Sequence, residues 1–112
     1  MKDRIYVNRI QTYCKHIISY TEDIQTEKEW TNNQLKVDAV LFNLEQIGET
    51  AKKISTITKN KFPDIHWLSI IGLRNLISHQ YEGVKLHFIY EIVTKDIPVL
   101  LKSLCEGMPD QP

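Results

Sequence analysis

The sequence lacks most features of a secreted, membrane-spanning or metal-stabilised protein. Its two cysteines, Cys14 and Cys105, lie near opposite ends of the 112 residues and have neither CxxC nor Cys/His zinc spacing. No apolar run approaches the roughly 18 residues of a membrane span, and the N-terminus has no signal-peptide hydrophobic segment. We therefore expect a cytoplasmic protein with reduced thiols, no metal, no cofactor and no membrane association.

The sequence also has no excess of either charge, since 14 Lys and Arg balance 14 Asp and Glu. Dedicated nucleic-acid binders usually carry a basic excess, because phosphate contacts dominate their affinity. Any binding of nucleic acid must therefore come from a local patch or a composite surface. With 42% hydrophobic and 25% charged residues, the chain is too apolar to be disordered, and we expect residues 1–112 to form a single domain.

Hydrophobic periodicity predicts helices almost throughout and no strand. Along the first segment, apolar residues recur every three or four positions, as on one face of a helix. These residues are Tyr6, Ile10, Tyr13, Ile17, Tyr20 and Ile24. Further helices are expected over 35–58, from 65 to somewhere within 74–81, and over 84–104. The predicted fold is an all-α, four- to five-helix up-and-down bundle.

Turn and capping residues refine these boundaries. The polar stretch 25–33 predicts a loop, with Asn32 or Asn33 as the N-cap of the second helix, and Asp64 is a candidate cap for the third. A glycine in mid-helix costs about 1 kcal/mol of helix stability relative to alanine. We therefore expect Gly48 to be there because another backbone approaches the helix closely at this point. Pro98 predicts a kink or restart of the last helix at 96–97.

Most polar residues have an ordinary structural interpretation. Glu45 and Glu49 lie one helical turn apart, as paired metal ligands do, but no second carboxylate-rich helix follows. Pairing of Glu49 with Lys52 and Lys53 on a solvated helix face is the simpler interpretation. His16, His66 and His87 have no partners in the sequence pattern.

The segment Arg74-Asn75-Leu76-Ile77-Ser78-His79-Gln80-Tyr81 differs, because polar and ionisable residues cluster after the most hydrophobic stretch. Histidine can take the proton of a ribose 2′-hydroxyl, and arginine can hold a phosphate in its transition state. Residues five apart lie about 140° apart on a helix, so the long arginine side chain or a helix end would have to bring them together. The structural alternative is that Arg74 caps a helix C-terminus, Asn75 stops the helix and His79 lies in a loop; spacing alone favours this alternative.

Several ordered stretches resemble the HepT-like family of the HEPN superfamily, small all-helical prokaryotic ribonuclease toxins. The matching stretches are Asp38-Ala39-Val40, Leu44-Glu45-Gln46-Ile47-Gly48-Glu49-Thr50-Ala51, Ile65-His66-Trp67, Gly72-Leu73 with the segment above, and Asp96-Ile97-Pro98-Val99-Leu100. They cover nearly the whole chain in order. Thr50 departs from the alanine more frequent in the family and affects no catalytic position.

The resemblance implies specific roles. Arg74 and His79 match the family's R-x4-6-H signature, the catalytic pair of a metal-independent endoribonuclease, and Asn75 matches the supporting polar residue after the arginine. Tyr81 matches the tyrosine onto which a minimal nucleotidyltransferase antitoxin transfers AMP, silencing the toxin. The resemblance also implies a homodimer in which two such segments face one cleft that binds RNA. Lysines of both copies could then make the cleft basic; the candidates are Lys52, Lys53, Lys59 and Lys61.

Two other interpretations remain. The chain could be a non-catalytic helical partner or substrate-binding subunit of a nucleotidyltransferase, an interpretation that the neutral charge favours. It could also be a dimerising four-helix protein whose tyrosine-rich first helix forms an interface, which excludes neither of the others.

Overall fold

The computed structural model describes residues 2–80 and 85–107, and for 78–80 it describes the backbone alone. Within this part of the chain, helices are joined by turns and there is no β-strand. The predicted all-α fold is therefore confirmed. None of the helices in these ranges has both the length and the hydrophobicity of a membrane span.

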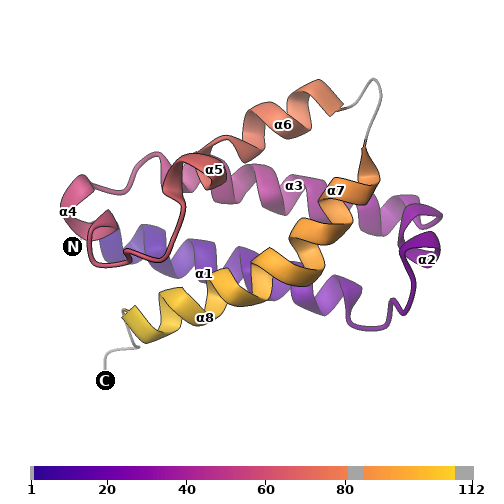
Figure 1. Cartoon of the computed structure of the whole chain (residues 1–112), viewed down its shortest axis with the longest axis horizontal. Coiled ribbons are helices and arrows are strands. Elements are labelled where there is room, and N and C mark those ends of the chain that lie inside the picture. Colours follow the sequence, from indigo (N-terminus) through magenta and orange to yellow (C-terminus); the bar gives the residue numbers. More distant parts are fainter. Residues whose placement is uncertain (1, 81–84, 108–112) are drawn as a thin grey trace.

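The helices of the described residues form four rods and two short connecting helices. The rods run in alternating directions (Figure 1). The rods are α1 (Lys2–Thr21), α3 (Gln34–Ala51), an arm made of α5 (Trp67–Ile71) and α6 (Leu73–Gln80), and a C-terminal rod made of α7 (Leu86–Glu91), a π-helical turn η1 (Ile92–Asp96) and α8 (Ile97–Gly107). The short helices are α2 (Glu27–Thr31) and α4 (Thr56–Lys59). This arrangement agrees with the predicted up-and-down bundle.

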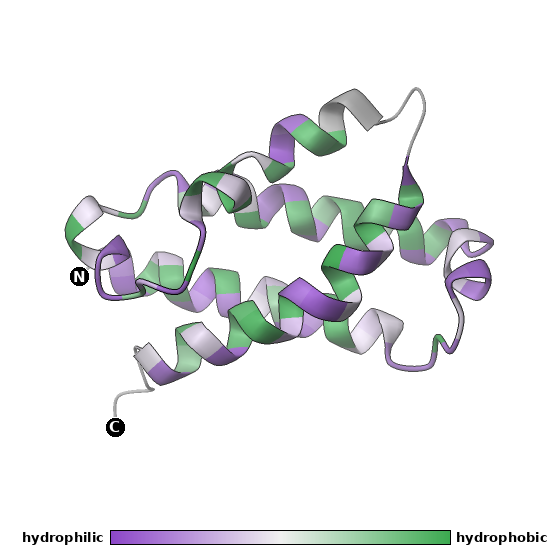
Figure 2. Ribbon diagram, viewed as in Figure 1, coloured by the Kyte–Doolittle hydropathy of each residue, from purple (hydrophilic) through white to green (hydrophobic). Residues whose placement is uncertain are grey.

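The core lies where α1 packs against α3 and α8. Hydrophobic and hydrophilic residues alternate along these three helices, as expected for amphipathic helices (Figure 2). The buried face of α1 includes Ile10 and Ile17, as predicted, together with Val7 and Cys14. The predicted tyrosines of α1 lie at the edge of this face, where Tyr6 and Tyr13 are half-buried. An edge position keeps a tyrosine hydroxyl near water while its ring packs.

The connection 25–33, predicted to be a loop, contains the short helix α2. The Thr26 hydroxyl accepts a hydrogen bond from the Glu29 backbone N–H at 3.2 Å, and Trp30 inserts fully into the core. Trp30 is the only apolar residue within 25–33, so this stretch has no hydrophobic periodicity from which a helix could be predicted. The predicted cap Asn33 is confirmed, since its side-chain oxygen accepts from Lys36 N–H at 3.1 Å.

The predicted helix over 35–58 is too long, because α3 ends at Ala51. Ser55 instead caps α4, its hydroxyl accepting from Thr58 N–H at 3.3 Å. The carboxylate of Asp3 accepts hydrogen bonds from the hydroxyls of Ser55 and Thr58, which holds the start of α1 against α4. These hydrogen bonds lower the pKa of Asp3. A serine whose hydroxyl accepts a hydrogen bond from the backbone N–H three residues later favours a helix start over a helix interior.

The predicted interruption near Pro98 is confirmed. A π-helical turn over residues 92–96 precedes α8, which begins at Ile97. Pro98 is the second residue of α8, directly after this turn. The wider turn accommodates the proline without separating α7 from α8 (Figure 1).

Candidate functional site

Gly48 determines how closely the α5–α6 arm approaches α3. A Cβ atom at Gly48 would lie 3.0 Å from the carbonyl oxygen of Ile70 and 3.3 Å from the backbone nitrogen of Arg74. The predicted close approach of another backbone is therefore confirmed. It places the first turn of α6, where Arg74 lies, directly against α3.

The arm contains two helices where the sequence predicted one. Gly72 forms the turn between them, donating its N–H to Leu68 O at 2.9 Å and accepting from Leu76 N–H at 3.0 Å. The prediction of Asp64 as cap is wrong, because α5 begins at Trp67, after His66. Asp64 lies in the turn before it, too far from the first helical N–H groups to cap them.

Helix α6 presents opposite faces to the core and to solvent. Leu73 and Ile77, four residues apart, are buried, whereas Arg74 and Asn75 are exposed. The helix continues to Gln80. The alternative in which Arg74 ends the helix, Asn75 stops it and His79 lies in a loop is therefore wrong.

His79 belongs to α6, but its side chain lies outside the described residues, as does the whole of Tyr81. On a continuous helix, position 79 follows position 74 by about 140°. Viewed down the helix axis, positions 74 and 79 bound an arc that also contains Asn75. The core-facing positions 73 and 77 lie on the other side of the helix. Backbone geometry thus places positions 74, 75 and 79 on the outward half of the helix.

Glu49, at the end of α3, is the carboxylate beside Arg74. Its Oε2 lies 3.4 Å from Arg74 Nε and 3.5 Å from Lys52 Nζ. The predicted pair of Glu49 with Lys52 is confirmed, whereas Lys53 lies over the ring of Tyr6 instead. The partner of Glu49 on α6 lies 25 residues away in sequence and was missed. The predicted pairing involved residues near one helix only. The close approach at Gly48 brings α6 to the carboxylate of Glu49 as well.

The four candidate lysines do not gather around Arg74. Lys52 shares a carboxylate with Arg74, whereas Lys53 Nζ lies 5.8 Å from the ring centroid of Tyr6 on α1. Lys59 Nζ lies 6.0 Å from the ring centroid of Trp67, and the charge of Lys61 acts on the Asp3 carboxylate of α1. Within one copy, Lys52 is therefore the lysine best placed to add positive charge beside Arg74.

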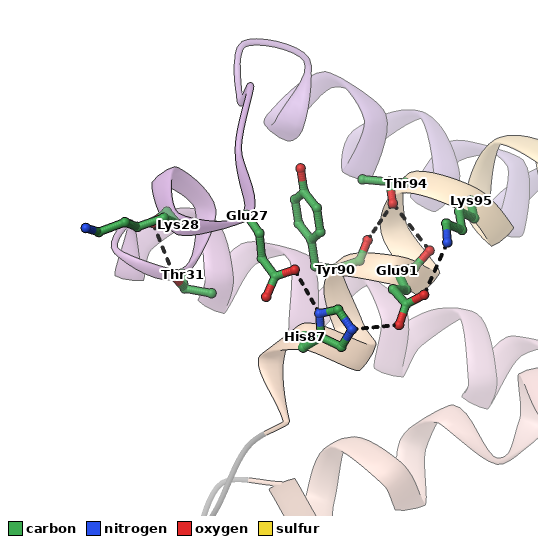
Figure 3. Close-up of polar contacts among 8 residues, drawn as sticks. All are labelled: Glu27, Lys28, Thr31, His87, Tyr90, Glu91, Thr94 and Lys95. Carbon is green, nitrogen blue, oxygen red and sulfur yellow. Dashed lines mark hydrogen bonds and ion pairs between the residues drawn. The ribbon is translucent and has the colours of Figure 1, made fainter.

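A second ionic cluster lies at the start of α7, close in sequence to residues 81–84 (Figure 3). His87 Nδ1 lies 2.8 Å from Glu27 Oε1 on α2, and Nε2 lies 3.0 Å from Glu91 Oε1. Glu91 also accepts from Lys95 Nζ at 3.2 Å. Hydrogen bonding and attraction from Glu27 raise the pKa of His87. Two carboxylates can both accept from the ring only when both nitrogens carry protons, so this geometry matches the imidazolium form.

Sequence reasoning assigned His87 no partner. The spacing of four residues to Glu91 could have indicated a helical pair, but the contact with Glu27 spans 60 positions and required the fold. His16 also has partners that the sequence pattern did not indicate, since its Nδ1 lies 3.3 Å from Asn43 Oδ1 and its ring stacks on Tyr20. In the described ranges, no three His, Cys, Asp or Glu residues are arranged to hold a metal ion.

A hollow of about 450 Å³ lies between the arm and the C-terminal rod. Leu73 and Leu76 line it from α6, and Ile97 and Leu100 line it from α8. Arg74 and Asn75 do not line it. The hollow is therefore separate from the exposed side of α6 that carries the candidate residues.

Comparison with known proteins identifies relatives along most of the chain. Residues 10–106 match the model of a family described as "Ribonuclease HepT-like". A Methanocaldococcus jannaschii protein named "Putative RNase MJ1380" is 35% identical over 88 residues, covering 79% of this chain and 80% of the relative. "Probable ribonuclease HepT" of Thermococcus cleftensis is 37% identical over 95 residues, or 85% and 86% of the two chains.

A further M. jannaschii protein, "Putative RNase MJ0125", is 34% identical over 100 residues, covering 89% of this chain and 85% of the relative. No solved structure gives a significant match. The family match includes α3, both helices of the arm and the C-terminal rod. Because it spans well over half of the sequence and agrees with the all-helical fold, the chain belongs to the HepT-like ribonuclease family.

Proposed function

We propose that the protein is a metal-independent endoribonuclease in which Arg74 and His79 are the catalytic residues and Asn75 is a supporting polar group. The observation that carries this proposal is the two-sided character of α6. Leu73 and Ile77 anchor the helix in the core while Arg74 and Asn75 remain exposed. Membership of the family and the ribonuclease names of its relatives support the assignment of RNA as the substrate.

The chemistry requires a base for the ribose 2′-hydroxyl and a cation for the phosphate. His79 accepts the hydroxyl proton as the 2′-oxygen attacks the adjacent phosphorus. The bond to the 5′-oxygen breaks, that oxygen takes up a proton, and a 2′,3′-cyclic phosphate remains. Arg74 stabilises the negative charge that develops on the phosphate oxygens.

The active form is proposed to be a homodimer in which two copies of α6 face one cleft. Positions 74 and 79 diverge by about 140° on one helix, so a second α6 opposite the first would surround a bound phosphate better than one copy can. Two copies of Arg74 and Lys52 would also give a neutral chain a local positive patch.

The nuclease is proposed to be a toxin that a minimal nucleotidyltransferase antitoxin silences by transferring AMP to Tyr81. Tyr81 follows the last residue of α6 directly. An added AMP group would bring bulk and a negative phosphodiester close to the catalytic helix, where it would compete with the RNA phosphate.

Cleavage of RNA by the purified protein in excess EDTA tests the proposal, once its intact mass has shown that Tyr81 carries no AMP. His79→Ala should lower the rate by about 10²–10⁴-fold, the usual contribution of a general base. His66→Ala is the matched control, since His66 is an exposed histidine at the start of the neighbouring α5. Equal cleavage by the parent and His79→Ala would contradict the assignment.

The zero net charge favours a second candidate function, a non-catalytic subunit of a nucleotidyltransferase. Expression in cells separates the two functions. A toxin should slow growth when expressed alone and be relieved by the nucleotidyltransferase, whereas a binding subunit should leave growth unchanged in both cases.

A further inference from the structure

The contact between Glu49 and Arg74 has a specific geometry. The carboxylate approaches Nε, the nitrogen within the arginine side chain, at 3.4 Å. Among the described residues, Arg74 makes no ion pair with a carboxylate other than Glu49. A guanidinium held through Nε can still present its two terminal nitrogens together to a phosphate.

The main-chain segments that carry Glu49 and Arg74 pack closely against each other. Gly48 precedes Glu49, and its α-carbon faces the backbone nitrogen of Arg74, which would lie 3.3 Å from an added Cβ. The carboxylate and the guanidinium therefore project from two main-chain segments in direct contact. Such support from a rigid neighbour reduces the conformations open to a long side chain.

The charge of the cluster also suits an anionic ligand. Glu49 interacts with two cations, Arg74 and Lys52, so the three groups together carry one net positive charge. The side chains of Glu49 and Arg74 remain 36% and 51% exposed, so the contact is open to solvent. An exposed ion pair of this kind contributes little to folding stability, so removing the carboxylate should leave the fold intact.

We propose that Glu49 is a positioning residue for RNA cleavage, which holds Arg74 through Nε so that its terminal nitrogens face the scissile phosphate. This inference rests on the proposed function. The opposite arrangement, in which Glu49 competes with phosphate for Arg74, predicts faster cleavage when the carboxylate is removed.

Glu49→Gln tests the role because it keeps the size of the side chain and removes its charge. We expect kcat to fall about 10-fold to 100-fold, the scale of a small misplacement of a catalytic group, with KM changing less than kcat. Glu45→Gln is the matched control. Glu45 lies one turn earlier on α3, and within the described residues the structure gives it no ion pair. The Glu45→Gln protein should cleave RNA at the rate of the parent, and Glu45→Gln and Glu49→Gln should have similar melting temperatures.

A double-mutant cycle separates positioning from general structural support. If Glu49 acts through Arg74, Glu49→Gln should cause no further loss in an Arg74→Ala protein. Additive losses, or unchanged or faster cleavage by Glu49→Gln, would overturn the positioning role while leaving the nuclease assignment intact. A parent free of AMP that cleaves no RNA would overturn the proposed function and this role with it.

Discussion

The α1–α3–α8 core and the α5–α6 arm are stabilised in different ways. In the core, helices bury apolar residues against one another, including Ile10, Leu44 and Leu104, each fully inaccessible to solvent. The arm packs chiefly on α3, and α5 contains no buried residue. The difference indicates that the core provides most of the stability and the arm presents polar groups. A site placed on the arm can change its chemistry without disturbing the packing that holds the fold.

The largest loss of stability should come from creating a cavity in the core. Leu44→Ala removes a fully buried side chain of α3 and should lower the free energy of unfolding by about 2–5 kcal/mol. Leu76→Ala on the arm removes a half-buried side chain and should cost clearly less. Urea denaturation of both variants measures the difference, and equal losses would show that the arm is as important for stability as the core.

A smaller effect is expected where the two regions meet. In Gly48→Ala, the new methyl group would lie 3.0 Å from a backbone oxygen of Ile70, which cannot move without shifting the arm. Overpacking costs about 1–3 kcal/mol, and the better helix propensity of alanine returns about 0.5–1 kcal/mol. We therefore expect the free energy of unfolding, measured by urea denaturation, to fall by about 1 kcal/mol. A more stable Gly48→Ala protein would show that the arm is not held by this contact.

The smallest effect should come from the exposed His87 cluster. Its contacts with Glu27 and Glu91 raise the pKa of His87 in the folded protein. A raised pKa means that the stabilisation is fully present below the unfolded value, about 6.5, and is lost as the pH rises through the folded value. Parent and His87→Gln should therefore differ in melting temperature at pH 5.5 and converge near pH 8.5. A difference that grows with pH would contradict the imidazolium assignment.

The part of the fold set by local periodicity and local chemistry could be predicted from the sequence. The helical class, the cap at Asn33, the close approach at Gly48 and the restart before Pro98 all follow from neighbouring residues. The break at Gly72 was missed, because apolar residues continue on both sides of it.

Contacts between distant segments could not be predicted. The partner of Glu49 lies on another helix, and Glu27 reaches His87 across 60 residues. Even the choice of the buried face on α1 depended on which helices pack there, since Val7 and Cys14 are buried while Tyr6 and Tyr13 lie at the edge. The roles of Arg74, His79 and Tyr81 remain predictions from the family motif.

Cleavage of a matched pair of substrates in EDTA is the sharpest test of whether the ribose 2′-hydroxyl attacks the phosphate. One is an RNA with a mapped cleavage site, and the other carries a single 2′-deoxyribose on the 5′ side of that site. A mechanism that uses the 2′-hydroxyl predicts that the unmodified protein cleaves the first, leaves a 2′,3′-cyclic phosphate and does not cut the second there. His79→Ala should cleave the first RNA about 10²–10⁴-fold more slowly. Cleavage at the 2′-deoxy position, or a 5′-phosphate product that requires added Mg²⁺, would contradict this mechanism.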